Sequence, residues 1–140
     1  MNQIVLTIAL CLASMIADAS DWEAISFGDE VIVYVDNESI RFRGDTAKAW
    51  IQWAYTKPRD LTNSYPAKKF VLVKSLKIFK CADRSSTTIQ SISYSDRDGS
   101  NVVDSNQTNE AIAQYSEVVP DTVGEEILNE VCQRKSAPKS

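Results

Sequence analysis

The residues from Phe70 to Cys81 read FVLVKSLKIFKC, a long stretch in which apolar side chains dominate. Apolar residues occupy both odd and even positions in it, whereas a strand with a single buried face would alternate strictly. This pattern predicts a long strand that is central in its sheet, or one that changes its buried face at a bulge. We therefore expect a β-sheet with this strand near its middle.

Shorter apolar runs on both sides predict further strands of the same sheet. Turn residues separate these runs, and Asp98-Gly99 is a strong signal for a hairpin turn. The additional predicted strands cover residues 22–27, 31–35, 40–43, 87–95 and 101–105. Residues 46–55 fit both the alternation of a strand and one face of a helix, and we assign them to a strand. Residues 57–69 contain two prolines and show no period, so we expect a long loop there.

One helix is predicted near the C-terminal end. Thr122 stands where an N-cap is expected and Glu125 follows three positions later, as in a capping box. Val123, Ile127 and Val131 then fall on one face of the helix. The predicted fold class is therefore α+β, an antiparallel sheet of about six strands with a C-terminal α-helix packed on it.

The first residues have the pattern of a signal peptide. An apolar stretch from Ile4 to Ile16 precedes Ala17-Asp18-Ala19, an A-x-A cleavage pattern. A lipid anchor at Cys11 is the competing interpretation, but bulky Leu10 stands where lipoprotein processing requires a small residue. We expect a signal peptide at residues 1–19, one domain at 20–134 and a flexible tail at 135–140.

Cleavage after Ala19 would remove Cys11 and leave two cysteines in an oxidising compartment. Cys132 lies at the edge of the apolar face of the predicted helix, where it points at the sheet. The sequence therefore predicts one disulfide, between Cys81 and Cys132, that ties the helix to the sheet.

Composition argues against several classes of function. The chain has no histidine, the commonest general base and metal ligand in proteins. Its net charge of -4 comes from acidic and basic residues that are mixed along the sequence, so no broad positive field is expected to bind nucleic acid. We expect a non-enzymatic protein without a metal, a cofactor or a transmembrane segment.

Two sequence features are candidates for partner binding. Basic residues gather around the first cysteine and could attract an acidic partner surface; they are Lys68, Lys69, Lys74, Lys77, Lys80 and Arg84. Arg43-Gly44-Asp45 spells the tripeptide that integrins bind, although turn chemistry alone also favours Gly-Asp. The three tryptophans are interpreted as packing residues.

Three stretches together resemble the surface adhesin protein E family of Gram-negative bacteria: residues 31–40, residues 74–94 and residues 119–132. The resemblance implies an antiparallel sheet with a terminal helix tied to it by the cysteine pair. It also implies a homodimer that binds host matrix and serum proteins such as vitronectin, laminin and plasminogen, partly through the strand that leads to Cys81.

The leading hypothesis is therefore an adhesin-like binding protein of the cell envelope, located in the periplasm, on the cell surface or outside the cell. The alternative is a periplasmic inhibitor or assembly factor that binds a bacterial partner protein.

Overall fold

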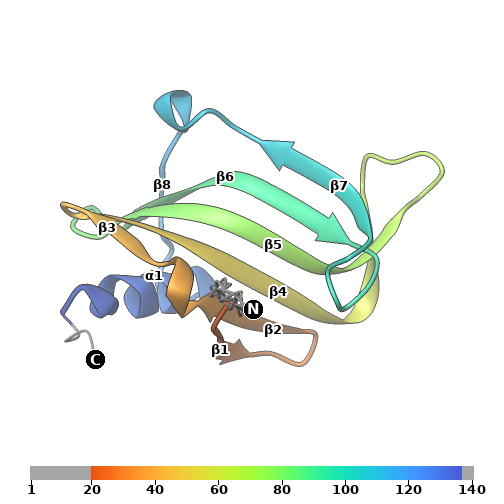
Figure 1. The fold of residues 1–140 in the computed structure, drawn as a ribbon, viewed down its shortest axis with the longest axis horizontal. Coiled ribbons are helices and arrows are strands. Elements are labelled where there is room, and N and C mark those ends of the chain that lie inside the picture. The colour runs from red at the N-terminus through yellow and green to blue at the C-terminus, as the bar shows by residue number, and fades with distance from the viewer. Residues whose placement is uncertain (1–19, 137–140) are drawn as a thin grey trace, which may run out of the picture.

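The computed structural model describes residues 20–136 and shows an antiparallel sheet with one α-helix packed against it (Figure 1). Six strands follow one another across the sheet in the order β1 (Trp22–Phe27), β2 (Val31–Asp36), β4 (Thr46–Asp60), β5 (Lys69–Lys80), β6 (Ser85–Tyr94) and β7 (Val102–Gln107). Two short strands lie off this path: β3 (Arg41–Arg43) pairs with β4, and β8 (Ser116–Glu117) pairs with β6. The predicted signal peptide, residues 1–19, lies outside the described residues.

The helix α1 spans Val123–Gln133, and its start confirms the predicted cap. The Thr122 side chain accepts a hydrogen bond from the backbone N–H of Glu125 at 3.4 Å. The Glu125 carboxylate accepts from the backbone N–H of Asp121 at 2.9 Å, one residue before the N-cap position that a capping box uses. Short 3₁₀ turns are found at η1 (Asn37–Ser39), η2 (Glu110–Ile112) and η3 (Arg134–Ser136). The predicted tail thus begins as a 3₁₀ turn, and residues 137–140 of it lie outside the described residues.

The main core lies between α1 and one face of the sheet. Alternate residues of β2 and β4 point to this face, and five of them are fully buried: Val33, Val35, Ala47, Ala49 and Ile51. From the helix, Ile127, Leu128 and Val131 complete the cluster, together with Phe79 of β5. Apolar alternation with a period of two on the strands thus meets an apolar helical stripe, which is the physical origin of the α+β fold.

The strand β5 is central, as its sequence predicts. It pairs with β4 on one side and with β6 on the other. A bulge lies opposite Leu76 and Lys77, where β6 has one additional residue. Phe79 is buried on the helix side while its neighbour Ile78 is buried on the opposite side, so this strand contributes apolar residues to both faces.

The segment at residues 46–55 is a strand, and its helical alternative is wrong. The predicted loop at 57–69 is wrong at both ends, because β4 continues to Asp60 and β5 begins at Lys69. The pair Arg59↔Phe70 and the pair Asp60↔Lys69 close this β4–β5 arm beyond a register shift. Pro58 lies in the register shift between Ala54 and Arg59, where no ladder pair is required of it, and Pro66 lies in the loop that remains between Asp60 and Lys69.

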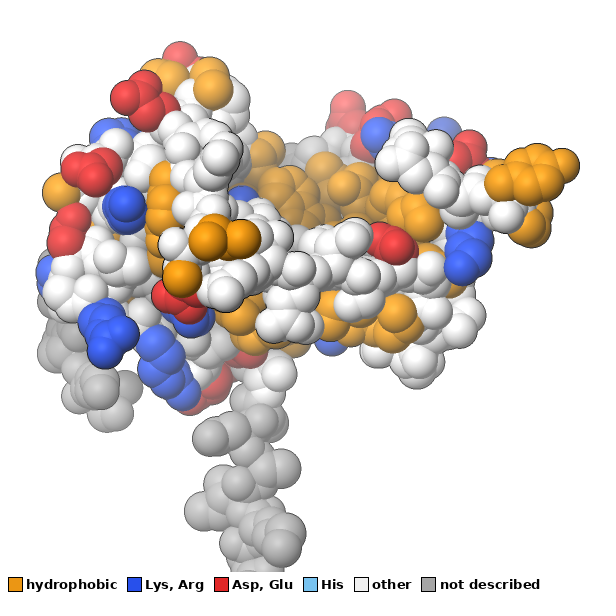
Figure 2. Space-filling model, turned by 90° about the horizontal axis from the view of Figure 1, so that it is seen from above, with side chains coloured by type: hydrophobic (Ala, Val, Ile, Leu, Met, Phe, Trp, Pro, Cys, Tyr) orange, Lys and Arg blue, Asp and Glu red, His pale blue; other side chains and the backbone are white. Residues whose placement is uncertain are grey.

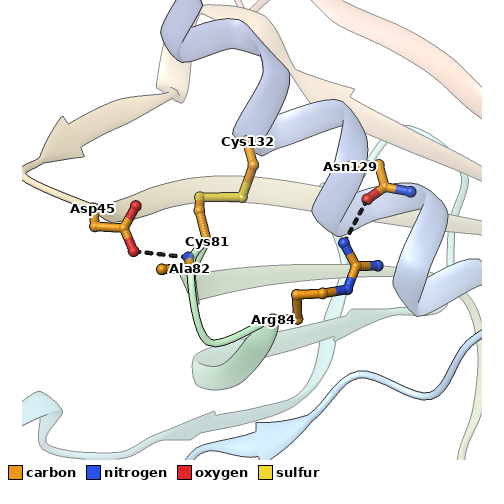
Figure 3. Close-up of a disulfide and its surroundings, with 6 residues drawn as sticks. All are labelled: Asp45, Cys81, Ala82, Arg84, Asn129 and Cys132. Carbon is orange, nitrogen blue, oxygen red and sulfur yellow. Dashed lines mark hydrogen bonds between the residues drawn. A yellow bond between two sulfur atoms is a disulfide. The ribbon is translucent and has the colours of Figure 1, made fainter.

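The disulfide between Cys81 and Cys132 is present and confirms the predicted pairing (Figure 3). The two Cα atoms are 5.8 Å apart, a normal separation for a disulfide. The bond joins the residue after β5 to the last turn of α1. It thereby fixes the helix against the end of the sheet.

Candidate binding surface

The face of the sheet opposite α1 carries partly exposed aromatic, apolar and lysine side chains, and we call it the open face. Residues directly opposite each other in antiparallel strands share a face. One row across the sheet is Tyr34, Gln52, Lys74 and Ile92, and the next holds Trp50, Leu76 and Gln90. These side chains are half-buried although no helix covers them within residues 20–136.

Three lysines belong to the open face. Lys74 lies between two aromatic rings, with its Nζ atom 5.5 Å from the ring centre of Trp22 and 5.6 Å from that of Tyr94. The Nζ atom of Lys80 lies 3.9 Å from the ring centre of Tyr115. Aromatic faces attract cations, so the rings hold these ammonium groups in place without neutralising them.

The third lysine has a carboxylate partner. Lys48 donates to Glu110 of η2 at 2.7 Å, and both side chains are partly exposed. The chain from Gln107 to Glu110 forms one wall of a shallow groove of about 640 Å³, whose floor includes Leu76 and Ile89. Figure 2, viewed from above the orientation of Figure 1, shows hydrophobic side chains gathered in a hollow of the surface.

The groove combines the apolar side chains of Leu76 and Ile89 with the ion pair between Lys48 and Glu110. Among residues 20–136, no group of three or more His, Cys, Asp and Glu side chains could hold a metal ion. The same part of the chain contains no helix with the length and apolar character needed to cross a membrane.

The sequence matches the family described as surface-adhesin protein E over residues 22–133. The chain belongs to this family. The match covers all eight strands and the helix, so the family assignment rests on the whole described domain and not on a single motif.

Solved structures of protein E show the same fold at low sequence identity. The crystal structure of protein E from non-typeable Haemophilus influenzae is 18% identical, with a TM-score of 0.56 over 81% of this chain and 77% of that chain. Crystal form II of Haemophilus influenzae protein E is 15% identical, with a TM-score of 0.55 over 85% of this chain and 99% of that chain. A comparison with curated proteins gives no match.

Within this family member, the predicted basic segment does not form one patch. Lys74 and Lys80 lie on the open face, whereas Lys77 points to the other side and donates to Thr88 at 2.8 Å. Lys69 forms an ion pair with Asp60 at 2.6 Å on the β4–β5 arm. Lys68 lies on the same arm, where its Nζ atom is 3.5 Å from the carbonyl oxygen of Val103.

Arg84 is the last member of that segment, and its side chain faces α1. Its guanidinium forms an ion pair with Glu125 and donates to Asn129 at 3.3 Å (Figure 3). The structure therefore brings together two of the six predicted residues, Lys74 and Lys80, on one face. Their role in binding a partner stays a prediction.

The tripeptide Arg43-Gly44-Asp45 forms the turn between β3 and β4, with Gly44 at a φ of +60°. The Asp45 carboxylate accepts a hydrogen bond from the backbone N–H of Ala82 at 2.7 Å (Figure 3). The backbone carbonyl of Asp45 also accepts from the N–H of Cys81 at 3.0 Å. This aspartate therefore stabilises the turn beside the disulfide, and integrin binding through the tripeptide stays a prediction.

The aromatic residues of the open face are the part of the surface that the sequence analysis missed. The sequence predicts packing roles for all three tryptophans, and Trp53 does pack against the main core. Trp50 lies on the opposite face of the same strand, and Trp22 contacts Lys74 from β1. The spacing of Trp50 and Trp53 predicts this difference, because two residues three positions apart on one strand point to opposite faces of the sheet.

Proposed function

We propose that this protein is an exported, non-enzymatic binding protein that acts at the cell envelope and attaches to macromolecules outside the cell. The observation that carries the proposal is the match to the surface-adhesin protein E family across residues 22–133. Host matrix and serum proteins are the proposed targets. Residues 1–19 are the proposed signal for export.

The physical character of the domain supports this proposal. A rigid sheet with one face packed on a helix leaves its second face available for a partner, and aromatic side chains on such a face supply large contact areas. The disulfide suits a domain that works in an oxidising compartment. A homodimer is part of the proposal, and light scattering in solution tests it.

The deciding experiment is protease accessibility on cells that carry the protein. Digestion on intact cells would support exposure at the surface, and binding of the purified domain to immobilised matrix and serum proteins would then identify the target. Protection until the outer membrane is opened would contradict surface exposure. That result would favour the alternative of an inhibitor or assembly factor in the periplasm.

A further inference from the structure

We infer that the open face between Lys74 and the groove below η2 binds an extended acidic segment of a partner protein. One carboxylate of the segment would bind Lys74, a second would bind Lys48, and an apolar side chain between them would lie over Trp50 and Leu76. The inference rests on the proposed function, since it names the surface and the partner chemistry that a binding protein of this family would use.

The first argument is the apolar character of an uncovered face. Trp50 and Leu76 are direct cross-strand partners on β4 and β5, and both are half-buried. Ile89 and Leu76 continue this apolar floor into the groove below η2. Trp50 and Leu76 stay partly exposed beside this groove, and apolar side chains exposed next to one another mark interaction sites on soluble domains.

The second argument is charge. Among residues 20–136, no carboxylate oxygen lies within 4.0 Å of the Lys74 ammonium, although this side chain is half-buried. This ammonium lies beside Gly99 of the β6–β7 turn as well as the two rings. A partner carboxylate would stabilise such a half-buried ammonium, whereas a partner cation would be repelled. The open face therefore presents a positive charge at Lys74 in a protein whose net charge is -4.

The third argument is spacing, which favours a peptide over a small ligand. Lys48 stands opposite Ile78, four residues along β5 from Lys74. Four residues of a strand span about 13 Å. An extended segment with acidic residues at positions i and i+4 and an apolar residue at i+2 places all three side chains on one face at this spacing.

Of the two lysines proposed to bind partner carboxylates, Lys48 already has a carboxylate partner, Glu110. Its ion pair with Lys48 is partly exposed, so a partner carboxylate can replace it at small cost. This competition gives a test in which a substitution strengthens binding instead of weakening it. Loss of folding cannot explain such a result.

The probe is a fluorescein-labelled peptide with the order Glu-Ser-Leu-Ser-Glu between neutral ends. The control peptide, Ser-Glu-Leu-Glu-Ser, has the same composition but puts its carboxylates on the face opposite the leucine. We expect fluorescence anisotropy titrations to give a higher affinity for the first peptide than for the control peptide. Lys74→Gln should weaken binding of the first peptide about tenfold, and Glu110→Gln should strengthen it about threefold.

Matched controls use exposed lysines away from the open face. Lys57→Gln and Lys135→Gln change the net charge by the same amount as Lys74→Gln and should leave binding unchanged. Indole N–H resonances locate the peptide independently. Those of Trp22 and Trp50 should shift on binding, while that of Trp53, on the other face, should stay in place.

Several outcomes would overturn the inference: equal binding of both peptides, unchanged affinity in Lys74→Gln, or a shift of Trp53 alone. Open-face tryptophan signals that change with protein concentration, without peptide binding, would show that a second copy fills the groove and would also overturn it. If the Lys74→Gln protein still binds matrix proteins as the wild type does, the proposed function stands and this inference fails. If the peptide binds but the protein is protected on intact cells, this inference stands and surface exposure fails.

Discussion

The bond between Cys81 and Cys132 links the end of the central strand to the last turn of the helix, across a sequence separation of 51. A crosslink over a loop of this length restricts the unfolded chain and stabilises the fold by roughly 4 kcal/mol in the chain-entropy model. We expect Cys132→Ser to lower the free energy of unfolding by about that amount, measured by urea titration. Wild-type protein kept reduced should match the variant, and an unchanged urea midpoint in both would contradict the role assigned to the bond.

Arg84 lies three residues after Cys81 and provides a second attachment of the helix. Its backbone has a φ of 50°, in the left-handed region that favours glycine, while its side chain contacts Glu125 and Asn129. Arg84→Ala should destabilise the domain, because it removes the contacts and keeps the unfavourable backbone. Arg84→Gly loses the same contacts but relieves the backbone, so it should be more stable than Arg84→Ala by about 1 kcal/mol.

Urea titration of the two variants measures this difference directly. Equal stability of the alanine and glycine proteins would show that the backbone at this position carries no strain. A wild-type protein no more stable than Arg84→Gly would show that the contacts with α1 contribute less than the strain costs.

The central strand and the helix could be predicted because each rests on a local pattern, and the disulfide could be predicted because cleavage after Ala19 would leave two cysteines. Period and length identify β5, and a cap followed by an apolar stripe identifies α1. The β4–β5 arm could not be predicted in this way. Its pairs, such as Asp60↔Lys69, depend on contacts between two segments. Pro58 lies in the first of these segments and Pro66 lies shortly before the second, so neither side of the arm has a regular strand pattern when it is read alone.

Of the candidate binding surface, only the positions of the charged residues could be predicted from the sequence. Basic residues around Cys81 are visible in the sequence, and parity along the strand already separates Lys77 from Lys74. The contact between Lys74 and Trp22 joins β5 to β1, which is three places away in the sheet. The pairing of Lys48 with Glu110 joins residues 62 positions apart. Neither contact follows from a local period.

Asp96 gives a prediction about pH. Its carboxylate accepts hydrogen bonds from the Ser100 hydroxyl at 2.7 Å and from the Asn101 backbone N–H at 2.8 Å, inside the β6–β7 turn. These bonds lower the pKa of Asp96 from 3.8 to about 2, with the Ser100 hydroxyl as the largest cause. Since the folded pKa is depressed, the stabilisation is fully present above pH 4 and is lost as the pH falls towards 2.

Asp96→Asn should therefore have a lower melting temperature than the wild type at neutral pH, and the difference should shrink between pH 4 and pH 2. Exposed Asp98 lies in the same turn, and Asp98→Asn controls for the change in charge. A difference between wild type and Asp96→Asn that stays constant down to pH 2 would show that the turn is stabilised by something other than the ionised carboxylate.

Lys77 gives a prediction of the opposite sign, because burial disfavours its charged form. Burial lowers the pKa of its ammonium below 10.5, so folding at neutral pH includes the cost of desolvating a charge. Its hydrogen bond to Thr88 compensates for part of this cost. Methionine has a similar length and no charge, so Lys77→Met should stabilise the domain by about 1 kcal/mol, a rise of several degrees in melting temperature.

The pH dependence separates this explanation from a general gain in packing. Because the pKa of Lys77 is lower in the folded protein, the free-energy cost of burying its charge is fully present at neutral pH. This cost disappears as the pH rises from the pKa of the folded state towards 10.5. The advantage of Lys77→Met should therefore be largest near pH 7 and decline in alkaline solution. Lys57→Met, at an exposed position, should show no such advantage. A gain that persists unchanged at high pH would assign the stabilisation to packing and not to the removal of a desolvated charge.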